Sequence, residues 1–191
     1  MIIGISGKMG VGKDYIVEHM LIPKVRASGK RVLTISFADQ VKINAASQNS
    51  MDIITMYGDK TPEIRKMLQT VGTEQGRMKH GEDIWIKYVS NWIKLWKMKD
   101  LADVFIITDC RFKNEVRWVE SQGIVIRIEA PDRNLERLKR ESNGSTKLLE
   151  SIQSHVSETE LDDYDFKYTI DNSKKTNQDL ILCFLDELRI F

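Results

Sequence analysis

The sequence predicts an α/β protein with a five-stranded parallel sheet, and three observations carry that prediction. Five short apolar runs, each of a length typical of buried strands, are spaced along the chain. Helix-like patterns of apolar residues separate them and follow the last one. A glycine-rich turn comes directly after the first run. Strands that alternate with helices build parallel sheets covered on both faces, so we expect three layers.

The apolar runs define the predicted strands. They are Ile2 to Ser6, Val32 to Ser36, Val104 to Thr108, Ile124 to Ile128 and Tyr168 to Asp171. Helical spacing of apolar residues defines the predicted helices in the same way. They are Asp14 to Ala27, Glu82 to Lys99, Phe112 to Ser121 and Thr176 to Leu188.

Polar side chains follow several of these strands. The second strand is expected to end at Phe37-Ala38-Asp39, the third at Asp109-Cys110-Arg111 and the fifth at Asp171-Asn172-Ser173. Active sites of parallel sheets lie at the carboxyl ends of the strands. We therefore expect these polar residues to gather at one edge of the sheet.

Composition excludes several classes of function. The 29 basic and 28 acidic residues leave a net charge of +1, which argues against a protein that coats a nucleic-acid polymer. Two cysteines offer no disulfide framework, which favours a reducing cytoplasm. No apolar run approaches the ~20 residues of a membrane span, and the start lacks the organisation of a signal peptide. We expect a cytoplasmic protein that does not bind membranes, and a homodimer stays open.

The glycine-rich turn matches the phosphate-binding pattern G-x-x-x-x-G-K between Gly7 and Lys13. In such a loop, successive backbone N–H groups cradle phosphate oxygens, and the next helix adds a favourable dipole. Gly10 and Gly12 permit the required backbone, and Lys13 would reach the β- and γ-phosphates. The residues predicted to bind ATP here are Gly7, Lys8, Gly10, Val11, Gly12, Lys13 and Asp14.

Asp14 stands where this pattern usually has Ser or Thr. Its carboxylate could hold Mg²⁺, directly or through water, or it could simply favour the helix dipole. Asp109 is the second candidate ligand for Mg²⁺. Arg111 has the planar fork that suits a phosphate. Asp109 and Arg111 could instead form a structural ion pair with each other or with Glu115.

The polar stretch from Pro131 to His155 predicts a helix, a flexible turn and a second short helix. Arg133, Arg137 and Arg140 lie on one face of the first helix, at i, i+4 and i+7. Aligned arginines in such a segment favour a lid that closes over the transferred phosphoryl group. The alternative is a solvated basic face, partly paired with neighbouring glutamates.

Several motifs resemble the phage-type deoxynucleoside monophosphate kinases. They are FADQVK at 37–42, TPEIRKMLQTVGTEQGR at 61–77, DIWIKYV at 83–89, IITDCRFKNEV at 106–116 and SHVSETELDDYDFKYTIDN at 154–172. The glycine-rich loop of that family likewise ends in Gly-Lys-Asp. The last motif is also similar to the phosphomevalonate kinases.

The resemblance implies a three-layer P-loop NTP hydrolase/NMP kinase-like fold with strand order 2-3-1-4-5. It implies one kinase domain over residues 1–191, with an acceptor-binding region at about 45–81 and a lid at about 131–154. The implied reaction moves the γ-phosphoryl group of ATP, with Mg²⁺, to a deoxynucleoside monophosphate.

The same resemblance suggests roles for individual residues. Lys13 and Arg111 would be catalytic, and Asn172 would join the ATP site. The spacing of the lid arginines, rather than the resemblance, adds Arg137 and Arg140 to the catalytic residues and Arg133 to the ATP site. The acceptor side would be lined by Asp39, Lys42, Arg65, Gln69, Arg77, Asp83, Trp85, Arg111 and Glu158. Trp85 could stack on a base, although its helical spacing with Trp92 and Trp96 is more typical of a core stripe.

Two other interpretations stay open at this point. One keeps the fold and changes the acceptor to phosphomevalonate or another small phosphorylated metabolite. The other is a nucleotide-binding switch that signals by conformation. A guanine-reading N-K-x-D is missing from DNSKKTNQD at 171–179, which disfavours a GTP switch. His19 and His80 form no metal-ligand pattern with Cys110 or Cys183, so zinc is not expected.

Overall fold

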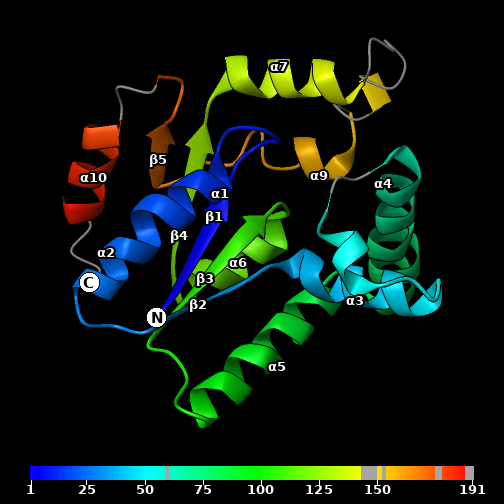
Figure 1. Cartoon of the computed structure of the whole chain (residues 1–191), viewed down its shortest axis with the longest axis horizontal. Coiled ribbons are helices and arrows are strands. Elements are labelled where there is room, and N and C mark those ends of the chain that lie inside the picture. The colour runs from blue at the N-terminus through cyan, green and yellow to red at the C-terminus, as the bar shows by residue number, and fades with distance from the viewer. Residues whose placement is uncertain (59–60, 143–149, 152–153, 175–177, 188–191) are drawn as a thin grey trace. The chain divides into compact units, whose positions relative to one another are not determined.

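A five-stranded parallel sheet with the order β2-β3-β1-β4-β5 lies at the centre of the fold (Figure 1). The computed structural model describes residues 1–58, 61–142, 150–151, 154–174 and 178–187. The strands are β1 (Ile2–Ser6), β2 (Val32–Ile35), β3 (Val104–Cys110), β4 (Gly123–Glu129) and β5 (Tyr168–Asp171). The predicted fold class and strand order are confirmed.

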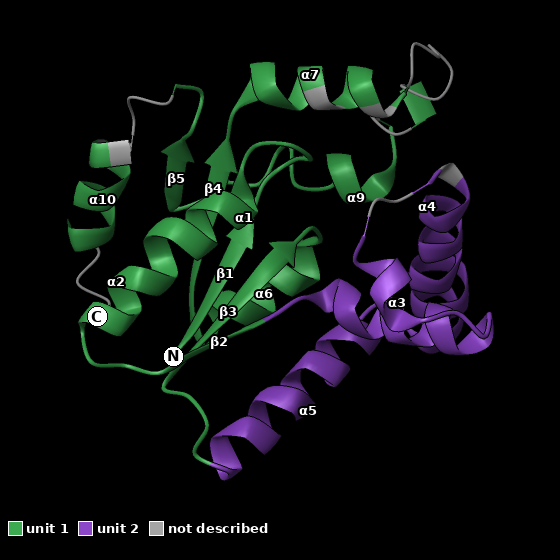
Figure 2. Cartoon of the chain, viewed as in Figure 1, with its two compact units in different colours: residues 1–34, 100–191 green, residues 35–99 purple. Residues whose placement is uncertain are grey.

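The chain divides into two compact units, which Figure 2 shows in different colours. Unit 1 comprises Met1–Thr34 and Asp100–Phe191, and unit 2 comprises Ile35–Lys99. Part of the predicted acceptor region at 45–81 falls in the described residues of unit 2, and the predicted lid belongs to unit 1. The exact limits of both regions stay predictions.

Unit 1 holds most of the sheet and its flanking helices. These helices are α1 (Lys13–Ile16), η1 (Val17–Leu21), α2 (Ile22–Ala27), α6 (Lys113–Glu120), α7 (Pro131–Glu141), α9 (Val156–Thr159) and α10 (Gln178–Glu187). The first three form one helical run, whose middle part, η1, is a π-helix. Pro23, the second residue of α2, has no N–H to donate, which accounts for an altered hydrogen-bond pattern at that place.

The core of unit 1 is the apolar contact between the sheet and this helical run. All five residues of β1 are buried, as expected for the central strand of a parallel sheet. The buried cluster consists of Ile3, Ile5, Val11, Ile16, Val17, Met20, Leu21, Val25, Val104, Ile106, Ile126, Ile128, Ala130, Ile170, Ile181 and Leu185. Burial of this apolar surface fixes the strand end from which the glycine-rich loop departs.

Unit 2 is helical: α3 (Phe37–Gln48), η2 (Ile53–Met56), α4 (Pro62–Gln69), η3 (Thr70–Met78) and α5 (Ile84–Met98). The predicted second strand, Val32 to Ser36, ends one residue earlier, at Ile35, and the residues expected at its end, Phe37 to Asp39, begin α3. Ser36 accepts the Ala38 N–H, and Asp39 accepts the Ser36 N–H in return. These bonds satisfy donors at the helix start and set its boundary.

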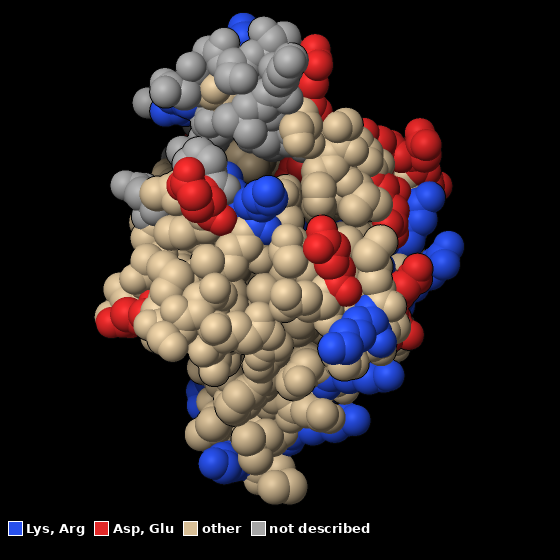
Figure 3. Space-filling view, turned by 90° about the vertical axis from the view of Figure 1, so that its right-hand side faces the viewer, with Lys and Arg blue, Asp and Glu red and all other residues tan. Residues whose placement is uncertain are grey.

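Charge is mixed on the surface of the molecule. On the face shown in Figure 3, acidic and basic side chains both occur and neither sign forms a continuous cover. Within the part of the chain that the structure describes, no helix is long and apolar enough to cross a bilayer.

Trp85 forms the centre of packing around η3. Only 5% of its surface is exposed, and its indole N–H donates to the Gly72 carbonyl at 2.9 Å. A Cβ on Gly76 would stand 2.2 Å from the Trp85 ring, whereas a Cβ on Gly72 would meet Val41 at 3.5 Å. The close approach of η3 to the indole therefore needs glycine at position 76.

We expect Gly76→Ala to lower the free energy of unfolding by about 1–3 kcal/mol, because the added methyl group overlaps the indole ring. Urea unfolding followed by circular dichroism measures the change. Gly72→Ala is the matched control from the same helix and should change stability far less. Equal effects of the two substitutions would contradict the proposed packing constraint.

Candidate functional site

The glycine-rich loop joins β1 to α1, and its backbone conformation requires glycine at defined points. Gly12 has φ +89°, and a Cβ there would stand 2.5 Å from the Asn172 amide nitrogen. Gly7 has φ +149°, and its Cβ would stand 2.5 Å from the Ile128 carbonyl oxygen. Side chains at either position would therefore push the loop away from β4 and β5.

Two asparagines from distant parts of the chain hold the loop. Asn172 is buried beyond the end of β5, and its amide nitrogen donates to the Val11 carbonyl at 2.8 Å. Asn134, on α7, donates to the Met9 carbonyl at 2.6 Å. In this structure Asn172 thus supports the phosphate loop, and its predicted place beside adenine stays a prediction.

Lys13 is folded back over the loop. Its Nζ donates to the carbonyl oxygens of Gly7 and Lys8, both at 2.9 Å. Burial and the neighbouring Arg111 charge lower the pKa of Lys13 from 10.5 to about 8, while Glu158 and two aspartates act in the opposite direction. The ammonium group is thus charged at neutral pH and titrates only slightly above it.

Arg111 forms an ion pair with Glu158, a partner that the sequence analysis did not name. Its guanidinium Nη1 donates to Glu158 Oε1 and lies 3.4 Å from the Ser157 carbonyl. Burial alone would lower the pKa of Arg111, but Glu158 and Asp109 outweigh it and raise that pKa. The other oxygen of Glu158 accepts the Met9 N–H of the loop at 3.1 Å. Glu158 therefore connects Arg111 to the phosphate loop.

Glu115 contacts the backbone of the turn that follows β3. Its buried carboxylate accepts the backbone N–H groups of Arg111 at 2.8 Å and Phe112 at 3.1 Å. This contact holds the turn between β3 and α6. It leaves the Arg111 guanidinium on the side of Glu158.

The two candidate metal ligands lie near the loop. Asp109 is half-buried inside β3, and its charge helps to raise the pKa of Arg111 and opposes the lowering of the pKa of Lys13. Asp14 is exposed in the first turn of α1. Among the described residues, no group of three or more His, Cys, Asp or Glu side chains has the arrangement of a metal site.

Helix α7 carries the three predicted lid arginines. Arg133 is half-buried and lies beside the loop, since a Cβ on Gly12 would stand 3.6 Å from its Nη1. Arg140 is exposed. The side chain of Arg137 lies outside the described part of the structure, as do residues 143–149 and 152–153 of the predicted lid. Of the three predicted lid arginines, Arg133 thus has a described side chain at the loop.

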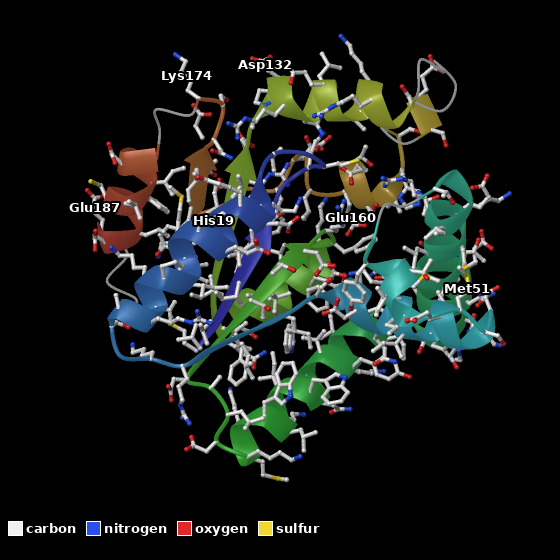
Figure 4. All side chains as sticks on the ribbon, in the orientation of Figure 1. His19, Met51, Asp132, Glu160, Lys174 and Glu187 are labelled. Atoms are coloured by element: carbon white, nitrogen blue, oxygen red, sulfur yellow. The ribbon has the colours of Figure 1, made fainter. Side chains whose placement is uncertain are left out.

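Sequence reasoning missed a second set of contacts, made by charged residues of unit 1. Arg127, buried in β4, donates to the Ser6 hydroxyl at 3.2 Å and stacks over Phe166. Lys8 pairs with Asp162 at 2.8 Å. Glu160, labelled in Figure 4, accepts the backbone N–H of Lys113 at 2.8 Å. A charged residue inside the apolar run of β4 was the signal that could have indicated the first contact.

The predicted acceptor-side residues, apart from Arg111 and Glu158, belong to unit 2. Asp39 Oδ1 accepts hydrogen bonds from Lys42 at 3.3 Å and from the Tyr57 hydroxyl at 2.8 Å. Arg65 and Arg77 are half-buried, and Gln69 and Asp83 are exposed. Trp85 is packed inside the unit. This burial agrees with the interpretation of its helical spacing as part of a core stripe. Its predicted contact with an acceptor stays a prediction.

A parallel sheet of this order, with a glycine-rich loop and lysine after β1, defines a P-loop nucleotide-binding protein of the kinase type. The model of the phosphomevalonate kinase family matches residues 5–124, more than half of the chain. The chain belongs to this family. Its membership of a kinase family implies ATP as co-substrate.

The comparisons with single proteins add two findings. Over 51 residues the chain is 51% identical to the deoxynucleoside-5'-monophosphate kinase of Escherichia phage T5. That stretch is 27% of this chain and 19% of the phage protein, so the match spans about a fifth of the relative's length. The predicted resemblance to the phage-type kinases is confirmed over this stretch.

Solved structures share the fold at low identity. The crystal structure of TT1252 from Thermus thermophilus covers 98% of this chain and 96% of its own, with a TM-score of 0.56 and 17% identity. A shikimate kinase from Acinetobacter baumannii in complex with shikimate covers 100% of this chain and 95% of its own, with a TM-score of 0.46 and 15% identity. The similarity to TT1252 supports the fold. The TM-score of the shikimate kinase is too low to support any conclusion about this chain.

We expect the affinity for ADP to fall as pH rises through about 8, because the Lys13 ammonium loses its proton there. Calorimetry at constant ionic strength between pH 7.5 and 9.5 measures the dissociation constant, which should rise by up to about tenfold per unit above the pKa. The ADP phosphates are ionised throughout this range. Arg111 stays charged, so a flat profile would contradict this role of Lys13.

We expect Glu158→Gln to tighten ADP binding about tenfold, because its carboxylate engages a loop N–H and Arg111, both of which suit phosphate oxygens. Titration calorimetry at pH 7.5 measures the change. Glu160→Gln, a control on the same segment, removes a charge that contacts Lys113 and should leave the affinity unchanged. Weaker ADP binding in Glu158→Gln would instead make Glu158 a positioning residue that phosphate does not displace.

Proposed function

We propose that this chain is a deoxynucleoside monophosphate kinase, which transfers the γ-phosphoryl group of ATP to a deoxynucleoside monophosphate and yields the diphosphate. The observation that carries the proposal is the 51% identity to the phage enzyme over 51 residues. The Gly-Lys-Asp end of the phosphate loop, at residues 12–14, supports the same branch. Such an enzyme would act in deoxynucleotide metabolism in the cytoplasm, in a host cell if its gene is a phage gene.

The donor side of the reaction rests on unit 1. Amides of the loop and Lys13 would hold the β- and γ-phosphates of ATP. Arg111 would stabilise the negative charge on the moving phosphoryl group, because its planar fork offers parallel N–H donors. Arg133, Arg137 and Arg140 would add charge and exclude water.

Asp14 and Asp109 are the residues that would hold Mg²⁺. Oxygen ligands suit this ion, which keeps several waters and usually takes only one or two protein carboxylates. A half-buried carboxylate in β3 and an exposed one at the start of α1 fit that requirement. When bound, the ion would neutralise charge on the β- and γ-phosphates.

The acceptor would be held mainly by unit 2. Arg65, Arg77 and Lys42 supply positive charge for a monophosphate, while Asp39, Gln69 and Asp83 supply hydrogen-bonding groups. The burial of Trp85 favours a supporting role there over stacking on a base. Glu158 would act on the acceptor side through Arg111, which it pairs with.

A phosphomevalonate kinase is the second candidate, and the family match over residues 5–124 favours it. Both acceptors present a phosphate to the transferred group. They differ because phosphomevalonate carries a carboxylate and no base. The choice between them is therefore a question of the acceptor site alone.

An ADP-release assay with ATP and Mg²⁺ tests the proposal. Its acceptor panel contains dAMP, dGMP, dCMP, dTMP, the ribonucleotides, phosphomevalonate and a reaction without acceptor. We expect turnover with at least one deoxynucleotide and loss of at least 10³-fold in Lys13→Ala, because the lysine contacts the transferred group. Turnover with phosphomevalonate alone would establish the second candidate, and ADP release equal to the acceptor-free reaction throughout would refute both.

A further inference from the structure

Tyr57 is an aromatic residue of unit 2 that no motif singled out. It directly follows η2, and 54% of its surface is exposed. Most exposed side chains are free to change rotamer, but the described contacts of this one restrict it. An exposed and fixed aromatic ring is a feature suited to binding a planar ligand.

The hydroxyl and one face of the Tyr57 ring are both engaged. The hydroxyl donates to Asp39 Oδ1 at 2.8 Å. Lys42 Nζ lies 3.9 Å from the ring centroid, in a cation–π contact, and 3.3 Å from the same Asp39 oxygen. Asp39 and Lys42 are themselves one turn apart on α3. The ring is thus fixed against the start of that helix.

The backbone below the ring is fixed as well. The Tyr57 N–H donates to the Ile54 carbonyl at 3.0 Å and closes the turn of η2. Asp52 caps the other end of this turn by accepting the Ile54 N–H at 2.9 Å. Tyr57 is therefore already ordered before a ligand binds. Binding does not cost the entropy of ordering this residue, which favours affinity.

Trp85 is the aromatic residue that sequence reasoning offered for base stacking, and its position does not suit that task. Its ring faces Gly76, its N–H is bonded to Gly72 and Tyr88 stacks on it at 5.9 Å. Tyr57 has the exposed area that Trp85 lacks. It also contacts two residues, Asp39 and Lys42, that the family resemblance assigns to the acceptor side.

We propose that Tyr57 is a specificity-determining residue that stacks on the nucleobase of the acceptor. The inference rests on the proposed deoxynucleoside monophosphate kinase function and names the part of the acceptor that unit 2 reads. The base would cover part of the 54% of the Tyr57 surface that is exposed. Stacking is tolerant of base identity, because every base has a π face.

The test compares acceptors with and without a base. The variants are Tyr57→Ala, Tyr57→Phe and, as a control, Ile54→Ala, which changes a 74% exposed residue of the same turn. Calorimetry measures the dissociation constants of the preferred deoxynucleoside monophosphate and of deoxyribose 5-phosphate. Steady-state kinetics gives KM for the acceptor and for ATP, and thermal unfolding verifies that each variant is folded.

We expect Tyr57→Ala to weaken deoxynucleotide binding and raise its KM about tenfold, with deoxyribose 5-phosphate binding and the KM for ATP unchanged. Tyr57→Phe keeps the ring and should stay within about threefold of the wild type in both constants. Ile54→Ala should match the wild type.

Equal weakening of both ligands in Tyr57→Ala would overturn the stacking role, as would a Tyr57→Phe variant that is as impaired as Tyr57→Ala. A wild-type protein that phosphorylates deoxynucleotides, with unaltered constants in Tyr57→Ala, would refute this inference and leave the proposed function standing. A wild-type protein that neither binds nor phosphorylates any deoxynucleotide would refute both.

Discussion

Positive charge concentrated at one loop is the constraint on which the rest of unit 1 depends. Lys13 and Arg111 lie close enough for Arg111 to lower the pKa of Lys13. Their joint presence is tolerated because Glu158 and Asp109 supply opposite charge. These partners come from β3 and α9, which are distant in sequence. The balance of charges at this edge of the sheet therefore forms only when folding brings the two elements together. The charges that suit a phosphate thus also organise the fold around it.

Strands were the most predictable part of the fold, and the reason is physical. A central parallel strand is buried on both faces, so Ile2–Ser6 reads as a continuous apolar run. Helix α3 was not predicted from apolar periodicity, because it has no broad apolar stripe. The sequence nevertheless indicates where α3 starts, because Ser36 is followed three residues later by Asp39, which is a helix-capping pattern. The cap, rather than apolar periodicity, therefore marks the start of this helix in the sequence.

The candidate site divides into a local part and a non-local part. The phosphate loop was predictable, since neighbouring residues and one strand end create it. Its supports were not, because Met9 is bonded to Asn134 and Glu158, which lie 125 and 149 residues away. Periodicity places Trp85 on a helix face, but only tertiary packing decides that Gly76 covers its ring. Contacts between residues so distant in sequence leave no spacing pattern that a single chain could reveal.

Donor chemistry alone cannot distinguish the acceptors open to this family. Lys13 and Arg111 are proposed to recognise phosphate, which every candidate acceptor carries, and Arg65 and Arg77 are proposed to recognise the same group. A difference in affinity must come from the part of the acceptor that differs, which is a planar base in one case and a branched hydroxy acid in the other. A base offers a π face and an apolar surface to an aromatic ring. The exposed, fixed ring of Tyr57, in contact with Lys42, therefore bears on the proposed substrate class in a way that the phosphate loop does not.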